Sequence, residues 1–493
     1  MSQSTAFLAC FFGIAIGDIG LYFLGYAANL LRLERRFMAM RRVRTILTQM
    51  KHSGAMTNSI LISRVIPGTR VPAYLAAGFL KYPFLKFVLL TVASVFSWVL
   101  VALLAGKSLS FLLMDHLFFG IALFILILKL VKFLVPPLIN EWDRRALFNS
   151  WRKWLAFEFW PAWLFYLPIV PYYAYLSLKH RSLLTPFYAN PNVLNGGLLG
   201  ESKWDFLKYL DPADPSTLGA FRIEQGADFL EVRELLERQE ITYPFILKPD
   251  VGQRGFGVRI IRDDFDLTEY LLLSSYPLIA QRLSSLPFEA GIFYVRHPSE
   301  QKGFLLSITD KKFPFVTGDG RSCLGDLILA DRRARIIAGT YFSRLKSQLD
   351  HVPPYGERVI LTECGNHCQG AVFENGERLE SPVLMATLDQ LAKRIPDFYF
   401  GRFDVRYLDE KSLKTGKFEI VEINGAGSEA THIWDKNTRL SEAYQTLFRQ
   451  WTLLFEIGAE VSATRPGTHI RLRRFLLECI RVFYRREPLS TSS

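Results

Sequence analysis

Cysteine is scarce in this sequence, and repeats are absent. The 493 residues include 5 Cys, at positions 10, 323, 364, 368 and 479, which are too few and too scattered to form a disulfide framework. We therefore expect the C-terminal half of the chain to lie in a reducing compartment. The sequence has no low-complexity segment, and its 40 Phe, 20 Tyr and 9 Trp exclude an intrinsically disordered chain.

Acidic residues are also comparatively few. The chain has 47 Asp+Glu against 59 Lys+Arg, which gives a formal net charge of +12. A basic chain suits nucleic acid or an anionic membrane surface, and the 50% hydrophobic content and the mean hydropathy of +0.15 favour the membrane. Because the basic residues cluster beside apolar stretches and not among paired aromatic side chains, we expect no nucleic-acid partner.

Three apolar stretches, residues 5–31, 83–105 and 117–135, are long enough to span a bilayer, since about 20 residues cross ~30 Å of hydrocarbon. No basic residues precede the first stretch and no convincing cleavage site follows it, so we expect a retained helix and not a signal peptide. Arginine-rich clusters at 32–44 and 144–153 favour the cytoplasmic side. We predict a multi-pass protein of the inner (cytoplasmic) membrane, in contact with the lipid bilayer, whose C-terminal half faces the cytoplasm.

Two further apolar stretches are interrupted by proline. Residues 60–80 contain two Pro, two Gly and two Arg, a composition that predicts a re-entrant segment, because broken backbone at membrane depth must be covered by protein or water. Residues 157–178 contain three Pro among Trp and Tyr, which is typical of the headgroup region. We expect this second stretch to lie at the membrane interface, and leave open whether it crosses.

Charged residues within the apolar region need partners, because each costs roughly 2.5–3.5 kcal/mol on insertion scales. The simplest arrangement places Asp18 near Arg64 and Arg70. The patterns G-D-x-x-x-Y-x-x-G at 17–25 and R-x-x-P-G-x-R at 64–70 resemble the DedA (VTT, SNARE-associated) family over residues 10–110. The resemblance implies translocation of a lipid or lipid carrier. The two arginines would contact a lipid phosphate or, alternatively, only hold the re-entrant segment together through backbone carbonyls and Asp18.

The composition changes near residue 184, where short β-like runs alternate with amphipathic helices. We predict strands over 243–250 and 418–425 and helices over 228–239 and 381–395. At the C-terminal end, residues 469–487 form an amphipathic, arginine-rich pattern. We expect a helix there that lies on the membrane surface or, alternatively, packs as an ordinary terminal helix.

A strand that ends in Lys248 precedes a loop with Gly252, Gly255 and Gly257. Backbone N–H groups of such a loop can approach a phosphate, although this pattern alone is common. Later in the chain, alternation places Arg402, Asp404 and Arg406 on one face of a strand and Glu422 and Asn424 on one face of the next. The oxygen donors suit Mg²⁺, and the Arg402 guanidinium suits an oxyanion. A surface hairpin held by ion pairs fits less well, because Phe, Ile and Val surround the carboxylates.

The combination of Lys248, R-x-D at 402–404 and E-x-N at 422–424 resembles the ATP-grasp superfamily over residues 185–460, most closely its carboxylate–amine ligases such as D-alanine–D-alanine ligase. The resemblance implies ATP and Mg²⁺ as cofactors, with Lys248 on the phosphates and residues 252–257 as the lid. It implies Asp404, Glu422 and Asn424 as metal ligands and Arg402 on the transferred phosphoryl group. It also implies the following nucleotide contacts: Gln281, Arg282 and Leu283 in the hinge strand, Glu289 near the ribose or the reacting groups, and Lys203 or Lys208 as a second phosphate-binding lysine.

Four other signals are weaker. Arg321 in a TGDGRS loop either meets a substrate carboxylate or is a solvated arginine in a turn. His432 either contacts the second substrate or has a capping or packing role, and Arg406 would contact substrate beside Arg402. Cys364, His367 and Cys368 are more typical of a polar loop facing the site than of a zinc site, since no second ligand cluster is present.

Together these expectations describe a multidomain protein, with an all-α membrane region that includes a re-entrant segment followed by an α+β ATP-grasp fold. Its parts are residues 1–110 (DedA-like), 111–183 (a further transmembrane helix and an aromatic connector), 184–462 (ATP-grasp) and 463–493 (basic helix and tail). The expected activity joins a small-molecule carboxylate to an amine through an acyl phosphate, with a lipid headgroup as one candidate substrate. The alternative is a lipid or lipid-carrier transporter whose ATP-grasp domain senses nucleotide.

Overall fold

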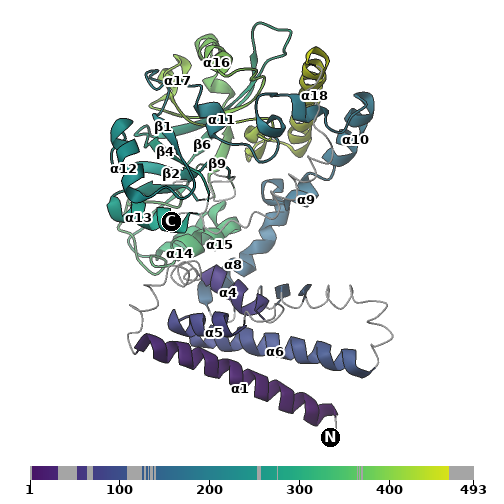
Figure 1. Ribbon diagram of the computed structural model, residues 1–493, viewed down its shortest axis with the longest axis vertical. Coiled ribbons are helices and arrows are strands. Elements are labelled where there is room, and N and C mark those ends of the chain that lie inside the picture. The colour runs from purple at the N-terminus through teal and green to yellow at the C-terminus, as the bar shows by residue number, and fades with distance from the viewer. Residues whose placement is uncertain are drawn as a thin grey trace. The chain divides into compact units, whose positions relative to one another are not determined.

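The chain separates into two units, Met1–Phe148 and Asn149–Ser493, and each is described by itself (Figure 1). The computed structural model describes residues 3–30, 53–63, 70–107, 125–126, 129–130, 133, 137, 140–252, 257–274, 276–362, 365, 367 and 370–465. Arg64, Gly255, Cys364 and Cys368 lie outside the described residues. The same is true of most of the predicted span 117–135 and of the predicted helix 469–487.

The elements of the N-terminal unit within its described residues are all helices. Its elements are α1 (Gln3–Leu30), α4 (Ser53–Ile62), α5 (Arg70–Phe79), α6 (Phe84–Lys107) and the start of α8 (Glu141–Ser150). In the described part of the chain, one helix is long and apolar enough to cross a membrane, over Phe7–Asn29, and Phe84–Val99 is a shorter apolar helix. The prediction of an apolar helix over 5–31 is thereby confirmed, whereas the re-entrant character of 60–80 and the membrane topology stay predictions.

Helices α1 and α5 cross at two glycines. A Cβ atom on Gly25 would collide with the backbone carbonyl of Leu75, and one on Gly78 would collide with that of Tyr22. Tyr22 also donates a hydrogen bond of 2.6 Å from its hydroxyl to the carbonyl oxygen of Tyr82, two residues before α6. Close approach of small residues is a usual means of packing helices in membranes, so the crossing depends on both glycines.

The second unit contains two main antiparallel sheets. The four-stranded sheet has the order β1-β4-β2-β3 and the five-stranded sheet has the order β11-β10-β5-β6-β9, while β7 and β8 form a separate pair. The strands are β1 (Ala220–Ile223), β2 (Phe245–Pro249), β3 (Arg259–Ile261), β4 (Leu278–Arg282), β5 (Phe288–Val295), β6 (Phe304–Lys312), β7 (Phe315–Thr317), β8 (Arg358–Ile360), β9 (Val372–Asn375), β10 (Phe400–Tyr407) and β11 (Glu419–Asn424).

Each main sheet packs against amphipathic helices. Val232 of α12 (Phe229–Arg238) and Leu267 of α13 (Asp264–Leu273) share a core with the four-stranded sheet. Leu388 of α16 (Pro382–Arg394) packs on the five-stranded sheet. The sequence sets these helix starts: Asp228 accepts a hydrogen bond from the Glu231 amide, and Ser381 caps α16 ahead of a proline in its first turn.

The predicted elements of the second unit are confirmed within one or two residues at their ends. β2 lies within 243–250, β11 within 418–425, α12 within 228–239 and α16 within 381–395. The link between β10 and β11 has secondary structure of its own. It contains α17 (Glu410–Lys414), which begins with a capping box between Asp409 and Ser412.

The aromatic stretch before residue 184 belongs to the second unit and packs on the last described helix of that unit. Phe165 and Ile169 share an apolar cluster with Leu447 of α18 (Leu440–Thr464). This contact explains why the second unit begins at Asn149. The remaining helices are η1 (Trp151–Leu155), η2 (Phe157–Phe159), α9 (Ala162–Phe165), α10 (Ile169–Lys179), η3 (Thr185–Tyr188), η4 (Leu194–Gly197), α11 (Trp204–Leu207), α14 (Leu324–Ala330), η5 (Ala334–Ile337), α15 (Ala338–Arg344), η7 (Glu377–Leu379) and η8 (Thr431–Trp434).

Candidate active site

The pairing of β10 with β11 builds the centre of the candidate site. Arg402 lies opposite Asn424, and Asp404 lies opposite Glu422. Because side chains two residues apart point to the same face of a sheet, all four face the same side. On the other edge of β10, Asp404 lies opposite Gly291 of β5, where an added Cβ would come within 3.1 Å of both the Arg402 and the Asp404 side chains. Gly291 therefore leaves room for this pair.

Asp404 is surrounded by donors. Arg402 donates two hydrogen bonds to its carboxylate, Nε to Oδ1 at 2.9 Å and Nη2 to Oδ2 at 3.0 Å. Lys311 Nζ lies 3.1 Å from Oδ1, and Asn424 Nδ2 donates to Oδ2 at 3.2 Å. Burial alone would raise the pKa of Asp404, but the charges of Arg402 and Lys311 outweigh it and lower the pKa to about 2. The carboxylate is therefore ionised at neutral pH.

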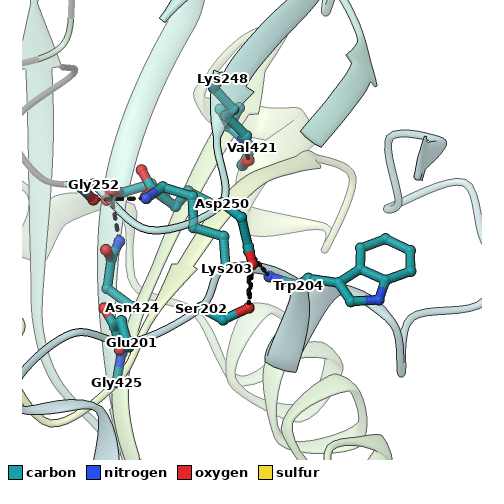
Figure 2. A network of polar contacts seen from close by, with 12 residues as sticks. Glu201, Ser202, Lys203, Trp204, Lys248, Asp250, Gly252, Val421, Asn424 and Gly425 are labelled. Carbon is teal, nitrogen blue, oxygen red and sulfur yellow. Dashed lines mark hydrogen bonds and ion pairs between the residues drawn. The ribbon is translucent and has the colours of Figure 1, made fainter. Parts of the chain in front are cut away.

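Lys248 and Lys203 converge on the same site from the four-stranded sheet and the loop before it (Figure 2). Lys248 Nζ donates to Gln281 Oε1 at 2.7 Å and to the Val421 carbonyl at 3.0 Å. Lys203 Nζ donates to the Gly252 carbonyl at 2.7 Å and lies 3.5 Å from Glu422 Oε1. Burial lowers the pKa of Lys248 to about 8, and the nearby charge of Glu422 offsets part of that effect.

Asp250, directly after β2, holds the loop at 201–204 by hydrogen bonds, as Figure 2 shows. Its carboxylate accepts hydrogen bonds from the Ser202 hydroxyl at 2.8 and 2.9 Å and from the Trp204 amide at 3.0 Å. These bonds bring Lys203 into the site. Lys208 instead pairs with Asp205 at 2.9 Å and is 36% exposed, so of our two candidates Lys203 is the lysine that the structure brings to Glu422.

The glycine loop is described at its two ends. The Gly252 carbonyl faces Lys203. Gly257 has a φ of +67°, and a Cβ there would lie 2.8 Å from the Pro249 ring, so this position requires glycine. In the neighbouring strand β4, the amide Nε2 of Gln281 is buried and has no hydrogen-bond partner within the described part of the chain. An orphaned buried donor beside Lys248 is consistent with a bound nucleotide. Leu283, just after β4, is 37% exposed.

The sequence analysis missed Lys311, which lies in β6 opposite Glu289. Its ammonium is 2.8 Å from Glu289 Oε1 and 3.1 Å from Asp404 Oδ1, and the side chain is 4% exposed. Glu289 therefore lies next to Lys311 and close to the Arg402–Asp404 pair, and its role stays a prediction. The only available signal was a pair of adjacent lysines at 311–312, and strand register alone decides which of them faces the site.

Glu201 was also missed. Its Oε2 accepts a hydrogen bond of 2.8 Å from the amide of Gly425, directly after Asn424. Burial raises the pKa of Glu201 to about 7, even though that amide and Lys203 favour the charged form. The local sequence predicts only the neighbouring Lys203, because the partner of Glu201 lies 224 residues away in the chain.

The three candidate substrate residues have different surroundings. Arg406 Nη1 donates to the Leu286 carbonyl at 3.2 Å, and its Nη2 lies 3.7 Å from Glu289. Arg321 is exposed, in a turn closed by Asp319. Nδ1 of His432 is buried without a partner among the described residues, and burial lowers the pKa of this imidazole. No contact between described residues joins Arg321 or His432 to the Arg402–Asp404 pair, so their roles stay predictions.

Glu429 closes the other side of Arg402. Its carbonyl oxygen accepts from Arg402 Nη1 at 3.0 Å, and its carboxylate accepts from the indole of Trp434 at 2.8 Å and from the hydroxyl of Tyr166. Burial raises the pKa of Glu429. Tyr166 belongs to the aromatic stretch, so that stretch reaches the candidate site.

Glu158, in the same stretch, accepts hydrogen bonds from Arg333 and, at 2.7 Å, from His367 Nε2. The ring of His367 also stacks on Trp434, with 5.6 Å between the centroids. The polar loop around His367 therefore contacts the aromatic stretch. Arg333 and His367 outweigh the effect of burial on Glu158 and lower its pKa.

The donor set at the β10–β11 pair fits Mg²⁺. The described residues contain no group of three His, Cys, Asp or Glu side chains suited to a metal ion. Asp404 and Glu422 nevertheless supply two carboxylates opposite each other, and Asn424 supplies an amide oxygen. Mg²⁺ commonly takes one or two carboxylates and completes its shell with substrate phosphates and water, so the donor types present here are those of such a site.

Comparison with protein families identifies a known domain in the N-terminal unit. Residues 2–108 match the family model of the VTT domain. The chain carries a VTT domain at its N-terminus. The VTT domain includes Asp18 and Arg70, whose side chains approach to 3.4 Å between Oδ1 and Nε. This contact agrees with the pairing that we expected for Asp18.

The solved structures similar to this chain include three ligases or synthetases. They are a bifunctional glutathione synthetase from Pasteurella multocida (13% identity, 48% of this chain and 34% of that chain, TM-score 0.29), the VanG D-Ala:D-Ser ligase from Enterococcus faecalis (12%, 54% and 64%, 0.32) and D-alanine–D-alanine ligase from Bacillus anthracis (13%, 57% and 71%, 0.32). A search of curated proteins found no match. The chain spans about a third of the glutathione synthetase.

Proposed function

We propose that this protein is a membrane-anchored ATP-grasp ligase that joins a carboxylate to an amine at the expense of ATP. One observation carries the proposal: Arg402 and Asp404 lie directly opposite Asn424 and Glu422, and Lys203, Lys248 and Lys311 converge on them. Phosphoryl transfer depends mainly on positioning and on neutralising charge. A site built from cations and oxygen ligands, without a protein nucleophile, is suited to that chemistry.

In the proposed reaction, a substrate carboxylate oxygen attacks the γ-phosphorus of ATP and ADP leaves, which gives an acyl phosphate. The amine nitrogen then attacks the acyl carbon, phosphate leaves, and the nitrogen loses a proton. Lys203 and Lys248 hold the phosphates, while Arg402 and Lys311 stabilise the charge on the transferred group. Asp404, Glu422 and Asn424 would hold Mg²⁺, which supplies further neutralisation of phosphate charge when bound.

The VTT domain and helix α1 support anchoring in a membrane. We infer the inner membrane, a multi-pass arrangement and a cytoplasmic catalytic unit from the basic clusters that flank the apolar stretches. In this arrangement one of the two substrates is a lipid headgroup or a precursor held at the membrane.

Purified full-length protein tests the proposal. With ATP, Mg²⁺ and a broad panel of amino acids and lipid headgroups, we expect ADP and phosphate to form only when both substrates are present. Glu422→Ala should abolish this conversion, whereas Glu234→Ala should not, because Glu234 is an exposed residue of α12. Absence of substrate-dependent ADP formation across the panel would count decisively against a ligase.

A second function is favoured by the VTT domain itself, since its match covers residues 2–108 and includes the buried Asp18. In this alternative the protein moves a lipid or lipid carrier, and the ATP-grasp domain senses nucleotide. Lipid translocation in vesicles separates the two: transport that persists in Glu422→Ala supports the transporter, and loss of ligation alone supports the enzyme.

A further inference from the structure

The aromatic stretch before residue 184 has two apolar faces, and only one of them is covered. On α10, Ile169 is 5% exposed and shares an apolar cluster with Leu447 of α18, and Leu176, two turns further along the same face, is 1% exposed. Val170 and Leu178, on the opposite side, are 63% and 80% exposed. A helix that is apolar all round is normally covered all round, so the outer side of α10 needs an occupant.

Exposed apolar side chains are concentrated in this part of the second unit. Among the described residues, 9 large apolar side chains in the range 151–183 are exposed, against 14 in the far longer range 184–465. We define the connector face as the members of this group on and just before α10, namely Trp163, Leu167, Val170, Tyr175 and Leu178. A concentration of this kind marks an interaction surface.

The charges around the connector face indicate what covers it. Residues 159–178 contain no charged side chain. Basic residues stand at both ends of this stretch, with Arg152 and Lys153 before it and Lys179 and Arg181 after it. An apolar, Trp- and Tyr-containing face between basic ends is the composition of segments that lie in the interface of an anionic bilayer.

We propose that the connector face lies in the headgroup region of an anionic membrane, parallel to its surface, and holds the catalytic unit there. The proposal does not depend on the ligase reaction. The same chain has a VTT domain that ends at residue 108, so a bilayer is within reach of the connector. Residues 466–493 are a poorer occupant, because their six Arg and two Glu give them the same sign of charge as the connector ends.

Docking in this way also orients the candidate active site. Trp163 of the connector face is three residues before Tyr166, whose hydroxyl donates to Glu429, and the Glu429 carbonyl accepts from Arg402. One short segment thus contacts the headgroup layer on one side and the neighbours of Arg402 on the other. The side of the site formed by Glu429 is therefore close to the membrane surface.

Nitroxide labels measure the docking directly. The five native cysteines are replaced by Ser, single cysteines are introduced as Leu178→Cys or Val170→Cys, and the full-length protein is placed in nanodiscs of phosphatidylglycerol and phosphatidylcholine. Phe265→Cys is the matched control, because Phe265 of α13 is also apolar and 75% exposed. We expect the ratio of oxygen to nickel-complex accessibility to be several-fold higher at 170 and 178 than at 265.

Two outcomes would overturn the proposal. The first is an equal ratio at 178 and 265, which means that the connector face is in water. The second is dipolar broadening between labels at 178 together with a low ratio, which means that a second copy of the chain covers the face. Having labels at both 170 and 178 guards against misfolding of one variant, since both side chains are mostly exposed. In phosphatidylcholine alone, the ratio at 178 should fall, because the basic ends lose their anionic partners.

Discussion

The two units of this protein bury charge in different ways. In the described part of the N-terminal unit, the one fully buried charged residue is Asp18, which is 1% exposed and paired with the half-exposed Arg70. In the second unit, buried lysines and carboxylates occur together, and Lys311 alone contacts both Glu289 and Asp404. The first arrangement is a single pair in an apolar setting, and the second is a network.

The difference follows from what each arrangement can bind. A single buried pair gains little net stability after desolvation, so its main effect is to fix how two helices meet. A network whose charges are already positioned can stabilise additional charge without reorganising, which is the main electrostatic contribution to catalysis. We therefore expect substitutions in the network to change turnover, and substitutions in the helical unit to change stability.

Arg402→Ala should have the largest effect. It removes a donor that contacts Asp404 twice and the Glu429 carbonyl once, and the loss of one oxyanion donor lowers turnover by about 10²–10³. ADP formation under saturating ATP measures it. Arg238→Ala is the control, because Arg238 is 71% exposed on α12. A folded Arg402→Ala protein with near-normal ligation would show that the network is structural, like the Asp18 pair.

Gly78→Ala tests the close packing of α1 against α5 in the N-terminal unit without changing any charge. The added Cβ would collide with the carbonyl of Tyr22 on α1, and overpacking of this kind costs about 1–3 kcal/mol. We expect a lower melting temperature of the N-terminal unit in detergent. Gly20→Ala provides the matched control, since a Cβ there has nothing within 4 Å. Equal melting temperatures for the two variants would mean that α1 and α5 do not cross as described.

Asp18→Asn should have a smaller effect on stability, about 1 kcal/mol, because Arg70 is 45% exposed and water replaces part of the lost attraction. The melting temperature should fall while the turnover of ADP formation stays unchanged. If turnover falls as far as in Arg402→Ala, the N-terminal unit affects turnover directly, and the expected difference between the two units is wrong. Lipid translocation in the same variant then becomes the decisive measurement.

The site could be predicted from sequence wherever local patterns determine it. Alternation along 402–406 and 422–424 placed those side chains on single faces, and the structure pairs the two strands in the register that brings the faces together. Lys311 could not be found in this way, because its contact with Glu289 depends on how β5 and β6 align. Register between strands depends on the whole sheet and not on the residues of one strand.

The aromatic stretch shows a second kind of limit. Its composition predicts a membrane interface, and the composition is the same whether its aromatic rings face lipid or protein. The structure packs Phe165 against Leu447 and sends the Tyr166 hydroxyl to Glu429. These partners are more than 260 residues away, so no local pattern contains them. Which face of the stretch is buried and which is exposed can be decided only once the fold is known.

The smallest expected effect is on the pH dependence of kcat/KM for ATP. This dependence distinguishes a buried lysine of the network from an exposed lysine. Burial lowers the pKa of Lys248 to about 8, so the ammonium is charged below that pH and loses its charge as the pH rises through it. Because kcat/KM reports the pKa of free enzyme groups, kcat/KM for ATP should fall above about pH 8, by at most about tenfold per pH unit. An exposed lysine would give this fall only above about pH 10.

Lys248→Arg provides the control, because a guanidinium stays charged far beyond this range. Its kcat/KM for ATP is expected to be lower than that of the wild-type protein at pH 7, since the longer side chain does not reproduce the hydrogen bond to Gln281. Its pH profile should nevertheless be flat between pH 7 and 9. A wild-type profile equally flat over this range would contradict the prediction, because it would mean that Lys248 stays charged despite its burial in the network.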